Sequence, residues 1–451
     1  MQLVEKHIIG RNHNWFKEID DFSLKCKDLY NTVLYQNRQV YFCKEENLED
    51  WDGLREIKRN KAFGGEILNE SEHRKWISKN KLEQYYKLPT QVSKEVVRQQ
   101  YRDWKSFTRG SFEFLKTPKK FLGKPKPPKY KKSDLDTGKG RCLACFYVSS
   151  NSISKKYLKK GIIKLSGLSI LITSKKAAKV KMVRIVPKYG RYVIELVYNV
   201  PKVPLKIDNG RYASIDLGIN SFSTVVFNTG LRPIIIDGKP LKNINNFYNK
   251  ELARLKSELK NNGFYLEQIN EKTGEIQEIR IDKHSSRALE RLTLKRNSKI
   301  EDYFHKSTTF LANYLASNNI NKLTIGKNDN WKQSVNIGKR NNQNFVTLPF
   351  NKFIEMLKYK CALRGISVDV VEESYTSKCS FLDGEPIRKH LFYKGYRKGK
   401  WFKSKKYGYI HADVNAAYNI GRKRNPKFLA KDGAEALPLV PYKYRPAYKS
   451  I

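Results

Sequence analysis

The order of strands and helices predicted after residue 210 is the feature that most constrains the fold of this chain. Short β-branched runs between turn residues predict strands, whereas apolar residues with a helical period predict helices. The predicted order is three strands, a helical region, a strand, a helix, a strand and a final helix, over residues 213–217, 223–227, 233–236, 246–260 with 285–318, 321–325, 349–363, 366–371 and 413–421. This order is that of an RNase H-like fold, so we expect an α/β domain over residues 208–424.

Two aspartates lie in the first strand and the final helix of this predicted domain. Asp216 belongs to the string Tyr-Ala-Ser-Ile-Asp-Leu-Gly-Ile-Asn, and Asp413 to the string His-Ala-Asp-Val-Asn-Ala-Ala-Tyr-Asn-Ile. A buried carboxylate costs free energy unless a metal ion or another partner compensates its charge. Alone, Asp216 fits an ordinary strand-to-turn sequence and Asp413 fits a helix N-cap. Together they predict a site where two Mg²⁺ ions, held by carboxylates from separate elements, act on phosphate.

The charge of the chain predicts a polyanionic partner. Its 451 residues include 89 Lys and Arg but 44 Asp and Glu, which gives a formal net charge of +45. This excess is far above what colloidal stability needs and favours nucleic acid. No stretch approaches the ~20 apolar residues of a membrane-spanning helix, and the first residues lack the apolar region of a signal peptide. We therefore expect an intracellular protein without a membrane partner.

The six cysteines are too few for a disulfide scaffold in a chain of 451 residues and fit a reducing compartment. Cys142 and Cys145 have the spacing of a zinc-binding pair, but no second pair completes four ligands. Because a predicted strand follows directly at Phe146, we interpret both cysteines as small apolar residues.

The N-terminal half divides into a helical region and an antiparallel β module. Apolar residues at intervals of three and four predict a helix over residues 13–36, and Ser93 as N-cap predicts a second helix. Residues 116–132 contain eight lysines and four prolines, so this segment is expected to run extended as a linker or a nucleic-acid track. Alternating and β-branched runs up to residue 200 predict strands, with a hairpin turn at residues 187–190.

Further strings between the two aspartates complete a recognisable set: Gly326-Lys-Asn, Trp331-Lys-Gln, Asn341-Asn-Gln-Asn-Phe-Val346, Glu372-Glu-Ser-Tyr-Thr-Ser-Lys-Cys379 and Ser380-Phe-Leu-Asp383. With the strings around Asp216 and Asp413, they resemble the RuvC-type nuclease domain of the transposon-encoded TnpB family. Members of this family are RNA-guided nucleases related to the type V CRISPR effectors. The resemblance covers essentially the whole chain, and in the N-terminal half it depends on the order of elements.

The resemblance implies a division into domains. These are a helical recognition lobe over 13–117, a β-barrel-like wedge module from 1–12 and 118–205, a RuvC domain over 208–424 with a target-strand-loading insert at 379–410, and a disordered basic tail over 425–451. It also implies a DNA endonuclease that depends on Mg²⁺ and binds two ions. The protein would bind a transposon-derived guide RNA as a monomer, and the guide would pair with double-stranded target DNA. We expect such a protein in the cytoplasm, associated with the nucleoid, and linked to transposition and DNA recombination.

The first departure from the family pattern concerns the third carboxylate. Many members carry a catalytic glutamate in the fourth strand, where this chain has Gly326. The fourth and fifth strands of an RNase H-like sheet are neighbours, so Glu373 at the end of the fifth strand is predicted to replace it. Glu372 is the alternative, because adjacent strand residues point to opposite faces. The predicted catalytic residues and metal ligands are Asp216, Glu373 and Asp413.

The second departure concerns zinc. Members commonly have a four-cysteine ribbon in the insert, but residues 379–410 contain Cys379 as their one cysteine, with His390 as the nearest soft ligand. We expect no zinc site and an insert that keeps its shape by packing while its Lys, Arg, Tyr and Trp residues line a single-stranded DNA path. Further nucleic-acid contacts are predicted at Arg98, Arg102, Lys119, Lys120, Lys124, Lys126, Lys327, Trp331, Lys332, Tyr375, Ser377 and Lys378.

Two alternatives stay open. Gly326 could mark the loss of catalysis, which would leave a nuclease-dead, RNA-guided DNA-binding protein. The chain could also be an RNA-independent transposase or its accessory protein, as the family was long labelled.

Overall fold

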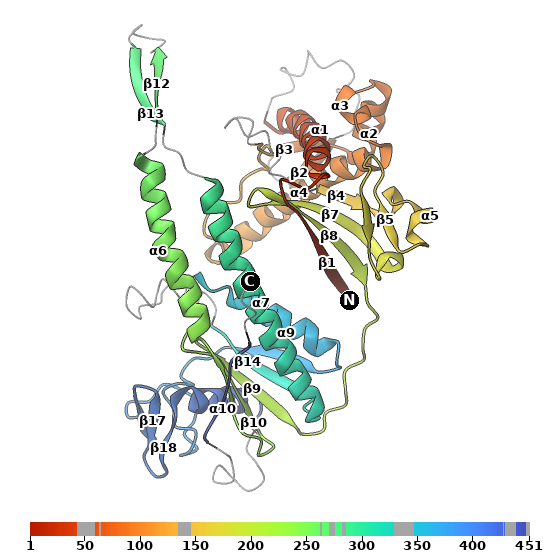
Figure 1. Cartoon of the computed structure of the whole chain (residues 1–451). Helices are drawn as coiled ribbons and strands as arrows, with labels where there is room; N and C mark the ends of the chain where they lie inside the picture. The colour runs from red at the N-terminus through yellow and green to blue at the C-terminus, as the bar shows by residue number, and fades with distance from the viewer. Residues whose placement is uncertain are drawn as a thin grey trace. The chain divides into compact units, whose positions relative to one another are not determined.

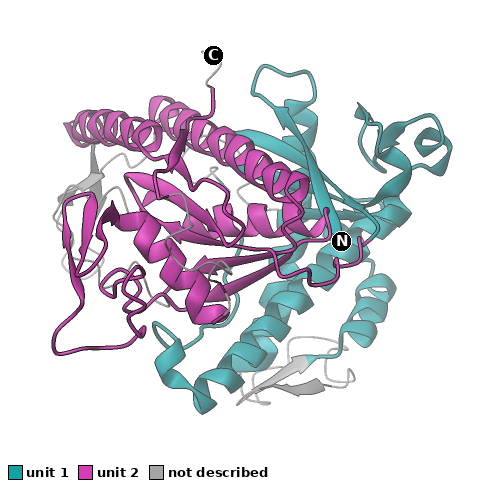
Figure 2. Cartoon of the chain, turned by 90° about the horizontal axis from the view of Figure 1, so that it is seen from below, with its two compact units in different colours: residues 1–201 teal, residues 202–451 magenta. Residues whose placement is uncertain are grey.

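The computed structural model describes residues 1–42, 59–62, 65–133, 146–261, 264–269, 276–281, 286–328, 347–426, 428 and 439–447. The chain forms two compact units, residues 1–201 and residues 202–451 (Figure 2). It is a mixed α/β protein with several antiparallel strand pairs, which confirms the predicted α/β class. None of the described helices is long and apolar enough to cross a membrane.

The first unit contains a four-stranded antiparallel sheet in the order β1-β8-β7-β4 (Figure 1). Its strands are β1 Gln2–Ile9, β4 Phe146–Ser149, β7 Val180–Lys188 and β8 Arg191–Asn199. Tyr189 and Gly190 both have positive φ and form the predicted hairpin turn between β7 and β8. Two short pairs are β2 Arg59–Ala62 with β3 Gly65–Leu68, and β5 Ile162–Lys164 with β6 Leu171–Thr173.

The helices of this unit agree with the predicted helical region but correct one boundary. They are α1 Phe16–Phe42, α2 Glu70–Lys79, α3 Glu83–Tyr86, α4 Thr90–Lys116 and α5 Lys155–Leu158. The prediction of Ser93 as N-cap is wrong, because Pro89 occupies that position and Ser93 lies in the first turn of α4. The Ser93 hydroxyl points back and donates to the carbonyl oxygen of Tyr85 at 2.6 Å.

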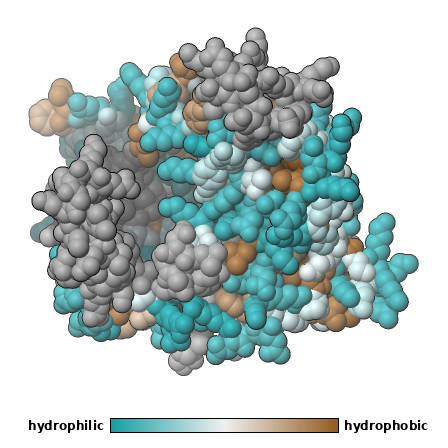
Figure 3. Space-filling model, turned by 90° about the horizontal axis from the view of Figure 1, so that it is seen from above, coloured by the Kyte–Doolittle hydropathy of each residue, from teal (hydrophilic) through white to brown (hydrophobic). Residues whose placement is uncertain are grey.

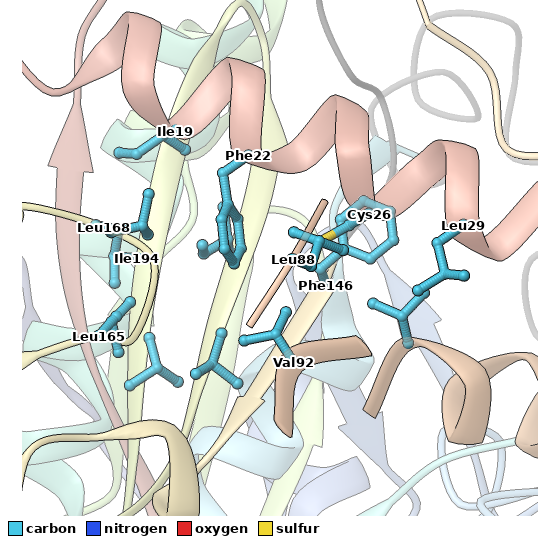
Figure 4. Packing of buried hydrophobic residues seen from close by; sticks show 14 of the residues in the cluster. Ile19, Phe22, Cys26, Leu29, Leu88, Val92, Phe146, Leu165, Leu168 and Ile194 are labelled. Atoms are coloured by element: carbon cyan, nitrogen blue, oxygen red, sulfur yellow. The ribbon is translucent and has the colours of Figure 1, made fainter. Parts of the chain in front are cut away.

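One face of α1 packs into the hydrophobic core of the first unit (Figure 4). Ile19, Phe22, Cys26 and Leu29 follow each other at intervals of three and four, so they line the same side of the helix. They face Leu88 and Val92 at the start of α4, Phe146 and Ile194 of the sheet, and Leu165 and Leu168 between β5 and β6. Each buried Leu, Ile, Val or Phe side chain contributes about 1.5–3 kcal/mol by leaving water.

The second unit contains a six-stranded sheet in the order β15-β14-β9-β10-β11-β19. Its strands are β9 Tyr212–Leu217, β10 Ser221–Phe227, β11 Ile234–Asp237, β14 Lys322–Gly326, β15 Ser367–Val371 and β19 Tyr442–Tyr444. β9, β10 and β11 are antiparallel neighbours, whereas β14 runs parallel to both β9 and β15. The parallel arrangement brings the carboxyl ends of β9, β14 and β15 to the same edge of the sheet.

Helices cover this sheet with two separate apolar clusters. The helices are α6 Lys239–Asn261, α7 Arg287–Ser317, α9 Phe350–Ala362 and α10 Ala412–Arg424. Phe222 of β10 stacks on Phe304 of α7 and on Phe350 of α9 in one cluster. Val226 of the same strand packs with α10 in the other. A hairpin of β12 Phe264–Ile269 and β13 Ile276–Ile281 lies between α6 and α7 in the chain (Figure 1).

The insert between β15 and α10 folds as a small antiparallel sheet of β16 Gly395–Lys398, β17 Trp401–Ser404 and β18 Gly408–His411. The predicted disordered tail over 425–451 needs correction for residues 442–444. These residues form β19, which pairs in parallel with β11, and Tyr444 stacks on Phe310 of α7 with ring centroids 3.8 Å apart. Pro441 directly precedes this strand and Lys443 lies within it, so these residue types did not prevent pairing with a strand that is distant in sequence.

Candidate active site

Asp216 lies in β9 on the side of the sheet that α10 covers. Side chains alternate along a strand, and Ile215 and Leu217 belong to the cluster with α7 and α9. Ser214 has the opposite orientation, since its hydroxyl donates to the carbonyl oxygen of Ala417 in α10 at 2.6 Å. Asp216 shares the face of Ser214 and therefore points toward the first turns of α10.

Asp413 is the second residue of α10, and not its N-cap, which is His411. A carboxylate in the first turn is favoured by the partial positive charge of the helix N-terminus. The string that contains Asp413 also fixes the helix. The Asn415 side chain accepts the amide of Phe381 at 2.8 Å and donates to Cys379, and Asn419 donates to the same carbonyl. The two asparagines thus act as structural residues that hold the start of α10.

Glu373 follows β15 and is held from the end of β14. The side chain of Asn328 donates to Glu373 Oε1 at 3.2 Å and accepts the backbone amide of Glu373 at 3.0 Å. Glu373 Oε2 is buried and lacks a hydrogen-bond partner. Glu372, in contrast, is exposed and pairs with Lys423 at 2.9 Å. The two adjacent glutamates point to opposite sides, and Glu373 is the one that points inward.

Gly326 provides the space that Glu373 uses. A Cβ atom added at Gly326 would lie 2.4 Å from Cδ1 of Ile420 in α10 and 3.1 Å from Glu373 Oε2. The first distance is shorter than any real contact, so the end of β14 has no room for a side chain. The carboxylate of Glu373 lies next to Gly326, 3.1 Å from where a Cβ atom of this β14 residue would be.

The charges of Asp413 and Glu373 both act on Asp216. The pKa of Asp216 is raised well above its usual range by burial and then by the negative charges of Asp413 and Glu373, while Arg397 opposes this rise. Burial, followed by the charge of Glu372, raises the pKa of Glu373 to about 7. A divalent cation would offset the repulsion that Asp413 and Glu373 exert on Asp216.

The donor set suits a hard cation, because carboxylate oxygens are the preferred ligands of Mg²⁺. The unpartnered Glu373 Oε2 is an oxygen that such an ion could satisfy. Within the described ranges, however, no three His, Cys, Asp or Glu side chains lie close enough together to hold an ion as they stand. Asp413 instead pairs with Arg397 of β16, whose Nη2 lies 3.2 Å from Oδ1. The guanidinium offsets the negative charge of this carboxylate.

Arg397 and Asn328 are the two site residues that the sequence did not single out. Arg397 is one of many basic residues in the insert, and nothing local distinguishes it. Asn328 ends the Gly326-Lys-Asn string, which was a usable signal. Its role becomes visible through its bonds to Glu373, a residue 45 positions later.

The other predicted nucleic-acid contacts occur in both units. Arg98 and Arg102 lie exposed on α4, and both pair with Glu95. The exposed set comprises Lys119, Lys120, Lys124, Lys126, Tyr375, Ser377 and Lys378, whereas Lys327 is half-buried after β14. Trp331 and Lys332, like Cys142 and Cys145, lie outside the described residues. The face seen in Figure 3 is largely hydrophilic with scattered hydrophobic residues, as expected for such a basic chain.

The mixed sheet and the three carboxylates around it define an α/β protein with a candidate metal-dependent site. A family model described as a probable transposase matches residues 195–332, and one described as the Cas12f1-like TNB domain matches residues 350–420. These matches fit a protein of the TnpB family, which confirms the resemblance predicted from the sequence motifs. No curated protein matches the chain.

Several solved structures are similar over most of the chain. A Cas12f1–sgRNA–target DNA complex is 15% identical with a TM-score of 0.34, covering 95% of this chain and 100% of that one. The mini-RNA-guided endonuclease CRISPR-Cas_phi3 is 12% identical with a TM-score of 0.43, covering 94% and 92%. CasPhi-2 (Cas12j) bound to crRNA is 11% identical with a TM-score of 0.39, covering 94% and 98%.

Proposed function

We propose that this chain is an RNA-guided DNA endonuclease of the TnpB type whose active site consists of Asp216, Glu373 and Asp413. The observation that carries the proposal is the position of Glu373. Its Oε2 is buried without a partner beside Gly326, and its charge acts on Asp216. A buried carboxylate oxygen that remains unpaired among other carboxylates is explained if it binds a cation.

The sheet of the second unit supports an RNase H-like, RuvC-type domain. Three antiparallel strands, β9 to β11, are followed by β14 beside β9 and by β15 beside β14. This neighbour relation is what allows a glutamate after β15 to replace one in β14. The helix that carries Asp413 then packs on β9, which carries Asp216.

Each residue of the proposed site has a distinct task. Asp216, Glu373 and Asp413 would hold the divalent ions, which when bound stabilise charge on the attacking and leaving oxygens of the phosphodiester. Asn328 orients Glu373 through two hydrogen bonds. Arg397 lies beside Asp413 with its guanidinium half-exposed, where it can contact a phosphate of the DNA strand.

The partners follow from charge and from the solved relatives. The net charge of +45 fits a complex with many phosphates, and similar structures hold guide RNA with or without target DNA. We propose that residues 13–117 and the wedge module of 1–12 and 118–205 bind a transposon-derived guide RNA. The 379–410 insert would then guide single-stranded DNA toward the site, and one copy would act on each RNA.

The experiment that tests this function compares wild type with Glu373→Gln in a guide-directed plasmid cleavage assay with Mg²⁺. The guide is obtained by sequencing the small RNA that copurifies with the protein. We expect cleavage by the wild type and a loss of about 100-fold or more in the variant, because a lost metal ligand removes several kcal/mol of transition-state stabilisation. The matched control is Glu372→Gln, since Glu372 is exposed and faces Lys423. It should cleave at close to the wild-type rate.

The same experiment separates the alternatives. Wild-type protein that binds guide-matched DNA without cutting it would be a nuclease-dead binding protein. Purified protein without stoichiometric RNA would favour an RNA-independent transposase. Loss of cleavage in Glu372→Gln but not in Glu373→Gln would exchange the assignment of the two glutamates.

A further inference from the structure

The small sheet of the insert has little hydrophobic core to stabilise it. Its three strands have four residues each. Phe402 and Ile410 are buried against α10, whereas the side chains of Tyr396, Trp401 and Tyr409 are exposed. A sheet of this size gains too little from apolar burial to be rigid by itself, so other interactions must fix its position.

Asp383 accepts four hydrogen bonds, and three of them come from Ser404, Lys405 and Lys406 at the end of β17. Its Oδ2 accepts hydrogen bonds from the hydroxyl groups of Ser380 at 2.5 Å and Ser404 at 2.8 Å, and from the amide of Lys405 at 3.0 Å. Its Oδ1 accepts the amide of Lys406 at 3.1 Å. Burial alone would raise the pKa of Asp383, yet these donors lower it below its usual range. The carboxylate therefore joins its own turn to the turn between β17 and β18.

Glu385 makes a second connection from the same turn. The residue is 1% exposed, its Oε2 accepts the amide of Ser380 at 2.7 Å, and its Oε1 accepts the amide of Lys394 at 2.9 Å. Lys394 immediately precedes β16, so Glu385 fixes the start of that strand. Together Asp383 and Glu385 form a carboxylate clamp on one end of the small sheet, defined here by these two residues.

The opposite end of the small sheet meets the candidate active site. The strand register places Gly395 opposite Ser404 at the clamped end and Arg397 opposite Phe402 toward the other end. There the Arg397 guanidinium contacts Asp413, and the amide of Ala412 donates to the carbonyl oxygen of Lys400 at 2.9 Å. β16 thus connects the carboxylate clamp directly to the residue beside Asp413.

We propose that Asp383 is a positioning residue of the candidate active site, which with Glu385 holds the β16–β18 sheet so that Arg397 meets Asp413. Asp383 does not touch the reacting atoms and acts through Arg397. The catalytic half of this inference rests on the proposed nuclease function. The structural half, that the clamp fixes the insert, does not.

Hydrogen exchange tests the structural half in the full chain. In Asp383→Ala the amides of Lys405 and Lys406 lose their hydrogen-bond acceptor. Amide exchange should therefore become faster over residues 394–412, a range that includes the amide of Ala412, which donates to Lys400. The matched control is Asp369→Ala, which removes an aspartate from an exposed pair with Arg424 in the same unit. It should leave exchange in the insert unchanged. Unchanged exchange in Asp383→Ala would overturn the clamp.

Cleavage kinetics test the catalytic half. Displacing an active-site group by about 1 Å can cost about 100-fold in rate, so Asp383→Ala should lower the rate at saturating target by roughly tenfold or more. If Asp383 acts through Arg397, the Asp383→Ala/Arg397→Ala double variant should be no slower than Arg397→Ala alone. If the rate losses of the two single variants multiply in the double variant, Asp383 does not act through Arg397.

A substitute variant and the separate exchange measurement keep the proposal testable. If Asp383→Ala fails to fold, Asp383→Asn keeps one acceptor oxygen and should give smaller changes in the same direction in both measurements. A wild type that does not cleave would refute the proposed function alone, because the exchange measurements would still decide whether the clamp exists.

Discussion

Gly326 shows how one missing side chain shapes the candidate site. The sequence leaves open that this residue marks a lost carboxylate, since the family that the chain resembles implies a glutamate in this strand. In the structure a Cβ added here would lie 2.4 Å from Ile420 Cδ1 of α10 and 3.1 Å from Glu373 Oε2. Gly326 therefore leaves room for the Ile420 side chain, and the inward-facing Glu373 lies beside it.

Gly326→Ala should consequently damage both stability and activity. The new Cβ would meet Ile420 Cδ1 at 2.4 Å and Glu373 Oε2 at 3.1 Å, so the side chain of Ile420 or that of Glu373 must shift. Overpacking of this kind costs about 1–3 kcal/mol, which denaturant unfolding would measure. Cleavage of guide-matched DNA should fall as well, because the added Cβ crowds Glu373, which belongs to the proposed site.

A second substitution tests the cause of this effect. Ile420→Val removes the Cδ1 atom, so the closest remaining contact of the alanine is Cγ1 at 3.0 Å. The double variant should recover part of the lost stability relative to Gly326→Ala alone. Gly10→Ala is the control, since nothing lies within 4 Å of its added Cβ. No stability loss in Gly326→Ala would mean that the space beside Glu373 is not tight.

The sequence predicted part of the site for reasons that apply residue by residue. That one of Glu372 and Glu373 points inward could be predicted, because adjacent strand residues point in opposite directions; which of the two it is stayed open until the structure. The close approach of Ile420 could not be predicted, because it depends on how α10 packs on the sheet. The carboxylate clamp was missed for the same reason: Asp383 binds Lys405 and Lys406, more than twenty positions later.

At the scale of elements, β19 is the strand that the sequence could not reveal. Three residues show no usable period, and their hydrogen-bonding partner is β11, more than 200 positions earlier. The longer elements were predictable because their apolar residues repeat often enough to identify a face, as in α1. β19 is stabilised instead by its partners, among them the completely buried side chain of Asp237 at the end of β11.

The role of β19 can be tested by ending the chain after residue 438 or after residue 447. Asp237 Oδ2 accepts two hydrogen bonds from Arg445, at 2.9 and 2.6 Å, and Oδ1 lies 3.3 Å from Lys443 Nζ. The shorter chain leaves a buried carboxylate without these cations and should lose about 1–3 kcal/mol in denaturant unfolding. The longer chain keeps β19 and should match the full protein.

Asp237→Asn should have opposite effects in the two chains. In the full protein it weakens the pairs with Lys443 and Arg445 and should destabilise the second unit. In the chain that ends after residue 438 it removes a negative charge that has lost both cations and keeps the backbone amide of Lys239, so it should restore stability. The same sign of effect in both chains would show that β19 does not neutralise Asp237.

At the scale of the whole molecule, charge and folding are largely separate. Each unit has its own apolar core, and the two described clusters of the second unit lie around one sheet. The excess of basic side chains adds nothing to these cores, and mutual repulsion among them opposes compactness. A function that uses the charge, binding to many phosphates, accounts for why the chain carries it.

Salt dependence of RNA binding therefore provides the whole-molecule prediction. If ten or so phosphates are neutralised, affinity for the copurifying RNA should fall by about 10³–10⁵ between 50 and 200 mM salt, as counterion release requires. Lys124→Ala/Lys126→Ala removes two exposed cations of the extended segment. It should lower the slope of log affinity against log salt concentration by the contribution of about two phosphate contacts. Lys87→Ala/Lys358→Ala removes the same charge from lysines that already pair with Glu83 and Glu355, so its slope should stay near wild type. Equal slopes for the two double variants would mean that the RNA responds to net charge alone and that the extended segment is not part of its path.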